Sequence, residues 1–237
     1  MWFPNWSSDP EYLPSLDELS EIKSDQKTWN FGFSDFIAHN PLWTPFQVLN
    51  DEFIKWISEE LLKIINKVSS KNIKILEVWA GSWRLSYFLK KELTIENTKK
   101  NIEIITTDDL SWFEDENTIF DNHEIYLKNN EWICVENLDA KKSVEKYEPN
   151  IVISSWMPKN KDWTLFFKDN KSINAFILIW VPSDCWTEET WKECDLFKLK
   201  ILDIKWNISW RDGHLPLTYL TSKNYDSSSK VVLFERK

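Results

Sequence analysis

The chain is short of glycine, with 3 residues in 237 where an average composition of about 7% would give roughly 17. Tryptophan is in excess, with 16 residues. One hypothesis is systematic replacement, in which the source reads the codon UGA as glycine and the sequence as written reads it as tryptophan. The alternative is a protein that is truly rich in tryptophan. The codons of the gene decide between the two.

Cysteine is also scarce, and no long apolar run is present. An odd, scattered set of Cys134, Cys185 and Cys194 argues against a disulfide framework and, without a second ligand pair, against a zinc site. No apolar run approaches the roughly 18 residues that cross a bilayer. The N-terminus lacks the basic start and apolar stretch of a signal peptide. We therefore expect a cytoplasmic protein with no membrane partner and no metal.

Basic residues are in the minority. Lys and Arg number 29 against 38 Asp and Glu, which gives a net charge of −9. Proteins that bind nucleic acid usually carry a basic footprint, so a small molecule or a protein is favoured over nucleic acid as partner, although a local basic groove stays possible. Hydrophobic residues make up 42% of the chain, enough for a globular core.

The first 45 residues differ in composition from the rest. Prolines, serines and aromatics punctuate residues 1–45, which predicts an extended arm with short helical turns. This arm is expected to pack on the main domain through Trp29, Phe31, Phe33 and Phe36. The main domain, residues 46–237, begins with an amphipathic helix up to residue 68, for which Asn50 or Asp51 also offers a start.

Strands and helices alternate after that helix. The pattern predicts a seven-stranded, mostly parallel α/β sheet with an antiparallel edge, because alternating βα units place helices on both faces of a parallel sheet. Residues 110–130 lack periodicity and are expected to be a loop-rich insertion. The expected strands are 72–78, 101–107, 132–135, 151–155, 175–181, 199–206 and a terminal pair at 217–222 and 230–235; the expected helices are 83–93, 141–147, 162–169 and 187–197.

The loop after the first of these strands carries the most informative motif. The run Ile75-Leu-Glu-Val-Trp-Ala-Gly-Ser-Trp-Arg-Leu-Ser86 becomes I-L-E-V-G-A-G-S-G-R-L-S if glycine stands at 79 and 83. Such a turn needs glycine for positive φ and for close approach of a ligand. A dinucleotide fold requires G-x-G-x-x-G, whereas the restored spacing is G-x-G-x-G followed by Arg84. The restored run resembles the first motif of class I S-adenosylmethionine (SAM) methyltransferases.

The resemblance covers about residues 70–185 and implies a Rossmann-like methyltransferase fold with SAM as cofactor. It implies that Glu77 holds the amino end of SAM and that the loop of Trp79, Gly81 and Trp83 contacts the cofactor. The remaining implied contacts are Asp108 or Asp109 to the ribose, Asp139 and Ala140 to the adenine, and Ser155 at the end of the fourth strand. From the residues alone, Asp139 equally fits the N-cap of the following helix.

The acceptor side is less defined. The segment Ser155-Trp-Met-Pro158 followed by Asp162-Trp-Thr164 is similar to a group of methyltransferase-like proteins, so Trp156 and Trp163 are expected to be true tryptophans. Trp156, Asp162 and His214 are the catalytic candidates. Transfer from a sulfonium can proceed by positioning alone, so no base is required. The segment lacks the Asn/Asp-Pro-Pro-aromatic motif linked to methylation of amino groups, and the acceptor stays unidentified.

Two further tryptophans stand where glycine is expected. Trp180 lies in a central strand and Trp186 in a tight turn. If all these tryptophans are literal, the favoured alternative is a non-catalytic, methyltransferase-like binding or interaction protein with a blocked cofactor loop. A nicotinamide-dependent oxidoreductase is a third interpretation, which the loop spacing disfavours.

Overall fold

The computed structural model describes residues 13, 15–21, 47–81, 83–95, 99–109, 122–126, 132–155, 162–180, 187–191, 195–202, 208–209 and 229–237. Trp156, Trp186, His214, the arm aromatics and the expected strand at 217–222 lie outside these residues. The expectations for them therefore stay predictions.

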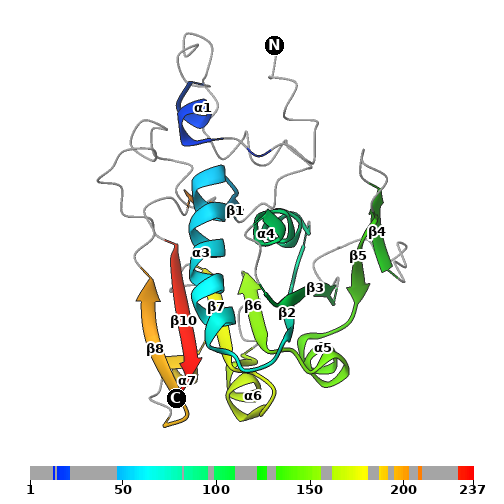
Figure 1. Ribbon diagram of the computed structural model, residues 1–237, viewed down its shortest axis with the longest axis vertical. Helices are drawn as coiled ribbons and strands as arrows, with labels where there is room; N and C mark the ends of the chain where they lie inside the picture. The colour runs from blue at the N-terminus through cyan, green and yellow to red at the C-terminus, as the bar shows by residue number, and fades with distance from the viewer. Residues whose placement is uncertain are drawn as a thin grey trace.

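A mixed sheet of eight strands forms the centre of the molecule (Figure 1). Five strands run parallel to one another, β10 runs antiparallel between β7 and β8, and β4 runs antiparallel at the far edge. The predicted mostly parallel Rossmann-like sheet with an antiparallel edge is confirmed, and the described sheet has eight strands where seven were predicted. In spatial order the strands are β4 (Asn122–Tyr126), β5 (Trp132–Asn137), β3 (Asn101–Asp108), β2 (Asn72–Val78), β6 (Ile151–Ser155), β7 (Ala175–Trp180), β10 (Lys230–Arg236) and β8 (Phe197–Leu202).

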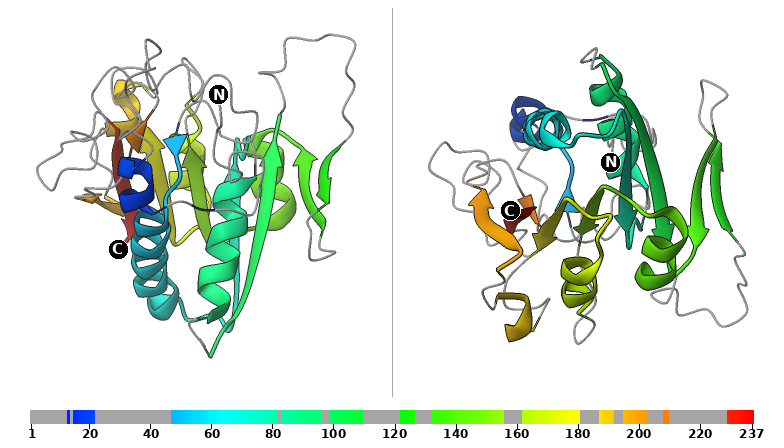
Figure 2. Two further views of the ribbon diagram at one scale, coloured as in Figure 1. Left: turned by 90° about the horizontal axis from the view of Figure 1, so that it is seen from above. Right: turned by 60° about the horizontal axis from the view of Figure 1, so that its bottom comes forward.

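Helices cover both faces of this sheet (Figure 2). The helices α3 (Asp51–Lys67) and α4 (Arg84–Ile95) pack with one buried cluster of strand side chains. The helices α5 (Ala140–Tyr147) and α6 (Thr164–Asp169) pack with a second cluster on the opposite face, and α7 (Glu188–Trp191) contacts α6. Because both faces are covered, β7 is a continuous apolar run, β6 begins with one at Ile151–Ile153, and the last four residues of β2 are all buried.

The first long helix starts at a definite cap. Asn50 is extended, and its side chain accepts a hydrogen bond from the backbone N–H of Phe53 at 2.9 Å. Of the starts that the sequence allowed, the cap at Asn50 is therefore the one adopted. Upstream, α1 (Leu16–Glu21) rests on this helix, since the backbone N–H of Leu16 donates to the Glu52 carboxylate at 3.0–3.1 Å.

The strand order reverses between β2 and β6. The chain moves from β2 outwards to β3 and β5, and then returns to place β6 and β7 on the other side of β2. In open α/β sheets, ligands bind beyond the carboxyl ends of the strands at such a reversal. The loop after β2 and the end of β6 therefore occupy the position where this fold class holds its ligands.

The structure differs from the sequence predictions at the sheet edges. Asn122–Tyr126, expected to be loop, is strand β4, which pairs antiparallel with β5. The helix expected at 187–197 ends at Trp191 in the described part of the chain, and Phe197 already begins β8. A two-stranded pair joins β1 (Gln47–Val48) and β9 (Ile208–Ser209). None of the helices described is both long and apolar enough to cross a bilayer.

Candidate functional site

The loop after β2 has the backbone of a glycine-rich turn. Trp79, Gly81 and Trp83 have φ of 53°, 51° and 61°. Side chains with a Cβ are disfavoured in this left-handed region by roughly 1–2 kcal/mol per residue, whereas glycine enters it freely. Among the described residues, the one other non-glycine case is Glu148, which lies at the C-cap of α5, a usual place for that conformation. The two loop positions predicted to need glycine thus adopt glycine's conformation.

The two indoles of this loop are buried on opposite faces of the sheet. Trp79 is 8% exposed and belongs to the cluster that contains Ala140 and Val144 of α5. Trp83 is 3% exposed, belongs to the cluster around α3 and α4, and packs edge-on against Tyr87 at a centroid distance of 5.7 Å. In the chain as written, both indoles of the loop are therefore buried, one in each of the two core clusters.

Backbone hydrogen bonds fix the loop against the neighbouring strand. The N–H of Ala80 donates to the carbonyl oxygen of Thr107 at 3.1 Å, and the N–H of Gly81 donates to Asp108 Oδ2 at 2.8 Å. The turn closes with a 2.8 Å bond from the N–H of Trp83 to the carbonyl oxygen of Ala80. The loop conformation is thus held by β3 as well as by its own turn.

Glu77 lies beneath this loop and is only 2% exposed. Its carboxylate accepts from the backbone N–H of Ser86 at 3.2 Å and from the Ser86 hydroxyl. Burial raises the pKa of Glu77 to about 7, with a smaller contribution from Asp108, and the two bonds from Ser86 oppose the rise. Glu77 therefore ties β2 to the first turn of α4, where a negative charge is favourable.

The two ribose candidates follow directly on β3. Asp108 is 1% exposed, and its carboxylate accepts the hydrogen bond from the Gly81 N–H. Asp108 therefore fixes the position of the loop. Asp109 comes next in the chain and is partly exposed. Asp108 thus contacts the loop, and Asp109 is the more accessible of the two.

The adenine candidates lie at the start of α5. Asp139 is the N-cap of this helix: its Oδ1 accepts from the N–H of Lys142 at 3.0 Å, and its Oδ2 is 3.1 Å from the Lys142 ammonium. Partial burial tends to raise the pKa of Asp139, but the bonds from Lys142 outweigh it and hold the pKa below its ordinary value. The capping interpretation is confirmed, and Ala140 is buried beside it.

Two serines end β6 at the strand reversal. The hydroxyl oxygens of Ser154 and Ser155 are both buried and have no hydrogen-bond partner. Ser154 itself is 0% exposed and pairs in register with Val78, the residue before Trp79. Sequence reasoning named Ser155 and missed Ser154, although two serines at the end of an apolar buried strand were the available signal.

Asp162 is engaged entirely within the protein. Its Oδ1 accepts from the N–H and the hydroxyl of Thr164 at 2.8 and 2.6 Å. Its Oδ2 accepts from the hydroxyls of Thr187 and Thr190, each at 2.6 Å. Partial burial tends to raise the pKa of Asp162, but these bonds lower it overall. The carboxylate links α6 to α7, and its catalytic role stays a prediction.

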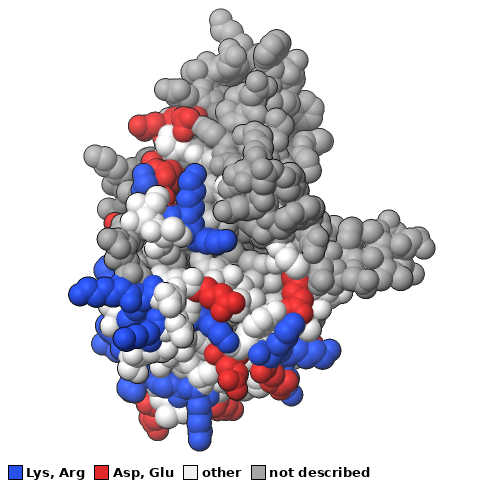
Figure 3. All heavy atoms as spheres, turned by 45° about the vertical axis from the view of Figure 1, so that its right-hand side comes forward, with Lys and Arg blue, Asp and Glu red and all other residues white. Residues whose placement is uncertain are grey.

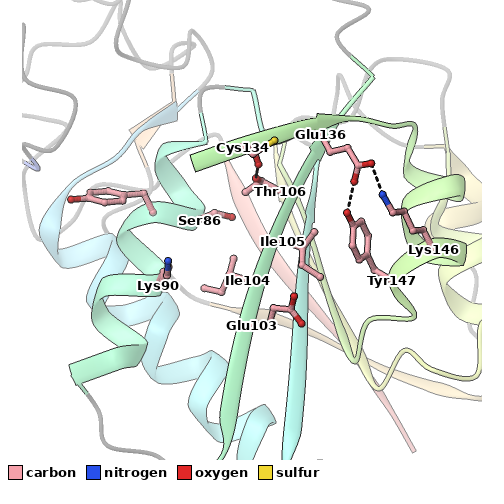
Figure 4. A pocket seen from close by; sticks show the side chains of 11 residues that line it. Ser86, Lys90, Glu103, Ile104, Ile105, Thr106, Cys134, Glu136, Lys146 and Tyr147 are labelled. Atoms are coloured by element: carbon pink, nitrogen blue, oxygen red, sulfur yellow. Dashed lines mark hydrogen bonds and ion pairs between the residues drawn. The ribbon is translucent and has the colours of Figure 1, made fainter. Parts of the chain in front are cut away.

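A hollow of about 460 Å³ lies beside β3, between α4 and α5 (Figure 4). At this hollow, β3 and β5 are apart. They pair only at Thr106–Asp108, while β5 pairs with β4 along most of its length. On its α5 side, Glu136 accepts from Lys146 at 2.5 Å and from the hydroxyl of Tyr147. Sequence reasoning did not identify this group, since its members come from two separate elements.

The surface near this hollow carries both signs of charge. On the face drawn in Figure 3, basic and acidic side chains are interspersed over the described surface rather than gathered by sign. Within the described ranges, no three His, Cys, Asp or Glu side chains are arranged to hold a metal ion.

Similarity to known proteins is found among solved structures and not at the level of sequence. No family model and no curated protein matches the sequence. Among solved structures, the 23S rRNA methyltransferase ErmE aligns over 79% of this chain and 68% of its own, with 12% identity and a TM-score of 0.39. Similarity at this level does not show a family.

The site fits a SAM-like cofactor in its backbone and acidic residues but not in its loop side chains. A loop with the backbone of a glycine-rich turn lies at the strand reversal and is followed by a helix. Acidic residues lie at the end of β3, at Asp108, and at the N-cap of α5, at Asp139. Trp79 and Trp83, however, place two buried indoles at the positions where such a loop has glycine. With glycine at both positions, the positive φ carries no Cβ penalty and the backbone can approach a ligand closely.

Proposed function

We propose that this protein is a SAM-dependent methyltransferase acting on an acceptor that is not identified. The observation that carries the proposal is the run of positive φ at residues 79, 81 and 83, directly after the central strand and at the strand reversal. That spacing is the G-x-G-x-G of the methyltransferase-like loop rather than the dinucleotide spacing. SAM would supply an electrophilic methyl group on a sulfonium.

The proposal includes glycine as the natural residue at positions 79 and 83. The low glycine count and the high tryptophan count suggest that tryptophan stands in place of glycine. The positive φ at Trp79 and Trp83 supports this separately, because composition does not dictate which tryptophans have positive φ. UGG codons at both positions would contradict this part of the proposal. Trp163, by contrast, has φ of −97°, which suits its assignment as a true tryptophan.

The residue roles rest on the resemblance and, for the described residues, on the positions given above. Asp109 would contact the ribose while Asp108 holds the loop, and Asp139 and Ala140 would border the adenine. Glu77 would act through the helix it anchors, by keeping the first turn of α4 under the methionine end. The acceptor would approach from the side of Ser155 and Trp156, with Asp162 and His214 as further candidates.

A calorimetric titration with SAM tests the proposal. The chain as written and the variant Trp79→Gly/Trp83→Gly are compared, with Trp163→Gly as a control for loss of an indole elsewhere. The proposal predicts binding by the double glycine variant and none by the control. Absence of binding by every version contradicts it.

The second candidate is a methyltransferase-like protein that binds a partner without catalysis. The observation that favours it is that both bulky indoles are accommodated as buried side chains at the two loop positions. It predicts that the protein from its natural source carries tryptophan at positions 79 and 83.

A further inference from the structure

The first half of β3 has no strand beside it on the side that faces β5. β5 pairs with β3 at Thr106–Asp108, and among the described residues no strand pairs with 101–105 on that side. On its other side, β3 is paired with β2 from Asn101 to Thr107. The amino-terminal half of β3 is thus an open strand edge within the sheet.

Two residues of this segment turn their backbone N–H and C=O groups to the open side. In a parallel sheet, successive residues of a strand bond alternately to its two neighbours. The N–H of Asn101 donates at 2.9 Å to the carbonyl oxygen of the residue just before β2, and the carbonyl oxygen of Asp108 accepts at 3.0 Å from the N–H that follows β5. Odd-numbered residues of β3 therefore bond towards β2, and Ile102 and Ile104 face the open edge.

The open edge forms the floor of a groove between α4 and α5, called here the β3 groove. Two hollows of about 460 and about 350 Å³ adjoin along it, since Lys90 and Ile104 line both. In Figure 4, Ser86 and Lys90 lie on the α4 wall, and Lys146 and Tyr147 lie on the α5 wall. An extended chain on this floor would have a helix over each face, as the central strands of the sheet do.

We propose that the β3 groove binds an extended peptide segment of a partner protein, which adds a short strand to the edge at Ile102 and Ile104. An open strand edge is a template for another extended main chain, because such a chain repeats donors and acceptors at the matching spacing. Walls on both faces admit a single strand more readily than the edge of a folded second copy. The inference goes beyond the proposed function, and no tryptophan is among the described residues that line the groove.

The walls define the side chains that such a segment carries. Every second side chain of an added strand faces α4, the face on which Ile102 and Ile104 are half-buried. These two favour β-branched apolar side chains, and the exposed ammonium of Lys90 favours a carboxylate beside them. The side chains between face α5, where Glu103 disfavours a second acidic group. We therefore expect apolar and acidic side chains towards α4 and neutral polar ones towards α5.

Amide hydrogen exchange of the full chain tests this proposal, with the capped pentapeptide acetyl-Val-Thr-Glu-Thr-Val-amide as probe. In the protein alone, the amides of Ile102 and Ile104 should exchange faster than that of Glu103, whose N–H bonds to β2. At saturating peptide, exchange at Ile102 and Ile104 should slow at least tenfold, and exchange at Glu103 should stay unchanged.

N-methylation of the peptide shows whether main-chain pairing carries the binding. Only every second N–H of a strand faces a given neighbour, so methyl groups on its second and fourth residues, or on its third and fifth, block opposite edges. One methylated peptide should bind at least tenfold more weakly than the parent, because it loses two hydrogen bonds, and the other should bind as tightly.

Charge exchange at Lys90 tests the expected side-chain chemistry. Lys90→Glu should weaken binding of the parent peptide about threefold and strengthen binding of the Val-Thr-Lys-Thr-Val peptide. Lys91→Glu is the matched control, because Lys91 is exposed on α4 and lines neither hollow. It should change neither affinity.

Failure of the parent peptide to bind overturns the inference, and so do three other results. Equal effects of the two methylated peptides would show that binding does not use a strand edge. Slow exchange of Ile102 and Ile104 in the protein alone would show that the chain covers this edge itself. A dimer that dissociates when the peptide is added, measured by sedimentation, would place a second copy in the groove.

Discussion

Gly81 donates its backbone N–H to the carboxylate of Asp108 across 2.8 Å, which fastens the loop after β2 to the end of β3. The bond joins the two segments that a nucleoside cofactor would span at the strand reversal. Asp108 thereby acts on any ligand of this loop through the loop conformation.

Replacing Asp108 by Ala should destabilise the fold and disorder the loop. The substitution leaves the Gly81 N–H without its acceptor in a partly buried place, which costs about 1 kcal/mol or more. Chemical denaturation measures the change, with Asp169→Ala, an exposed carboxylate at the end of α6, as control. An equal effect of the two substitutions would show that the Asp108 bond has no special weight.

Glu77 should make stability depend on pH near neutrality. Its pKa is about 7 in the folded protein and about 4.5 when unfolded, so the folded state binds more protons between these values. The stabilisation is complete below about pH 4.5 and is lost as pH rises through 7, by about 3 kcal/mol in total. Urea denaturation at pH 5 and pH 8 measures it. Glu77→Gln should lack this part of the pH dependence, and an unchanged dependence would sink the assignment.

The difference in stability between a glycine and an alanine variant at position 79 should show whether the backbone there has positive φ. Both Trp79→Gly and Trp79→Ala remove the indole, but only alanine keeps a Cβ that opposes positive φ. The glycine variant should be the more stable by about 1 kcal/mol or more. At Trp163, with φ of −97°, the order should reverse, with alanine ahead by about 0.4–1 kcal/mol. Thermal unfolding of the four variants decides, and alanine being favoured at 79 would exclude the left-handed loop.

Replacing Asp162 should lower the stability of the fold. Asp162→Ala removes the acceptor of three threonine hydroxyls that link α6 to α7, and we expect a loss of about 2 kcal/mol. Thr187→Val removes a single one of these bonds and should cost about 1 kcal/mol. If Asp162→Ala keeps full stability, the linkage carries no weight and the predicted catalytic role becomes the better account of this residue.

The centre of the fold was predictable from sequence, and the edges were not. Short segments rich in isoleucine, valine and leucine, such as 72–78 and 151–155, predict buried strands, and the structure has strands at those bounds. β4 escaped prediction because an edge strand of five residues in a polar stretch has no clear pattern of its own. The position of β10 between β7 and β8 depends on pairing over a long sequence separation, which local pattern does not encode.

The candidate site divides in the same way. The glycine requirement at 79 and 83 was visible because a βα turn restricts its backbone locally, and both positions have positive φ. The capping by Asp139 was visible for the same reason. The bond between Gly81 and Asp108, the threonine partners of Asp162 and the unpartnered hydroxyl of Ser154 depend on tertiary packing. No spacing in the sequence indicates them.

The central claim is that the loop between β2 and α4 is a cofactor loop with glycine at positions 79 and 83. Tandem mass spectrometry of the protein purified from its natural source, on the peptide that spans Glu77 to Arg84, tests it most directly. The account predicts glycine at both positions and tryptophan at 163. Tryptophan at both 79 and 83 would contradict it, and would mean that the natural protein carries two indoles in this loop.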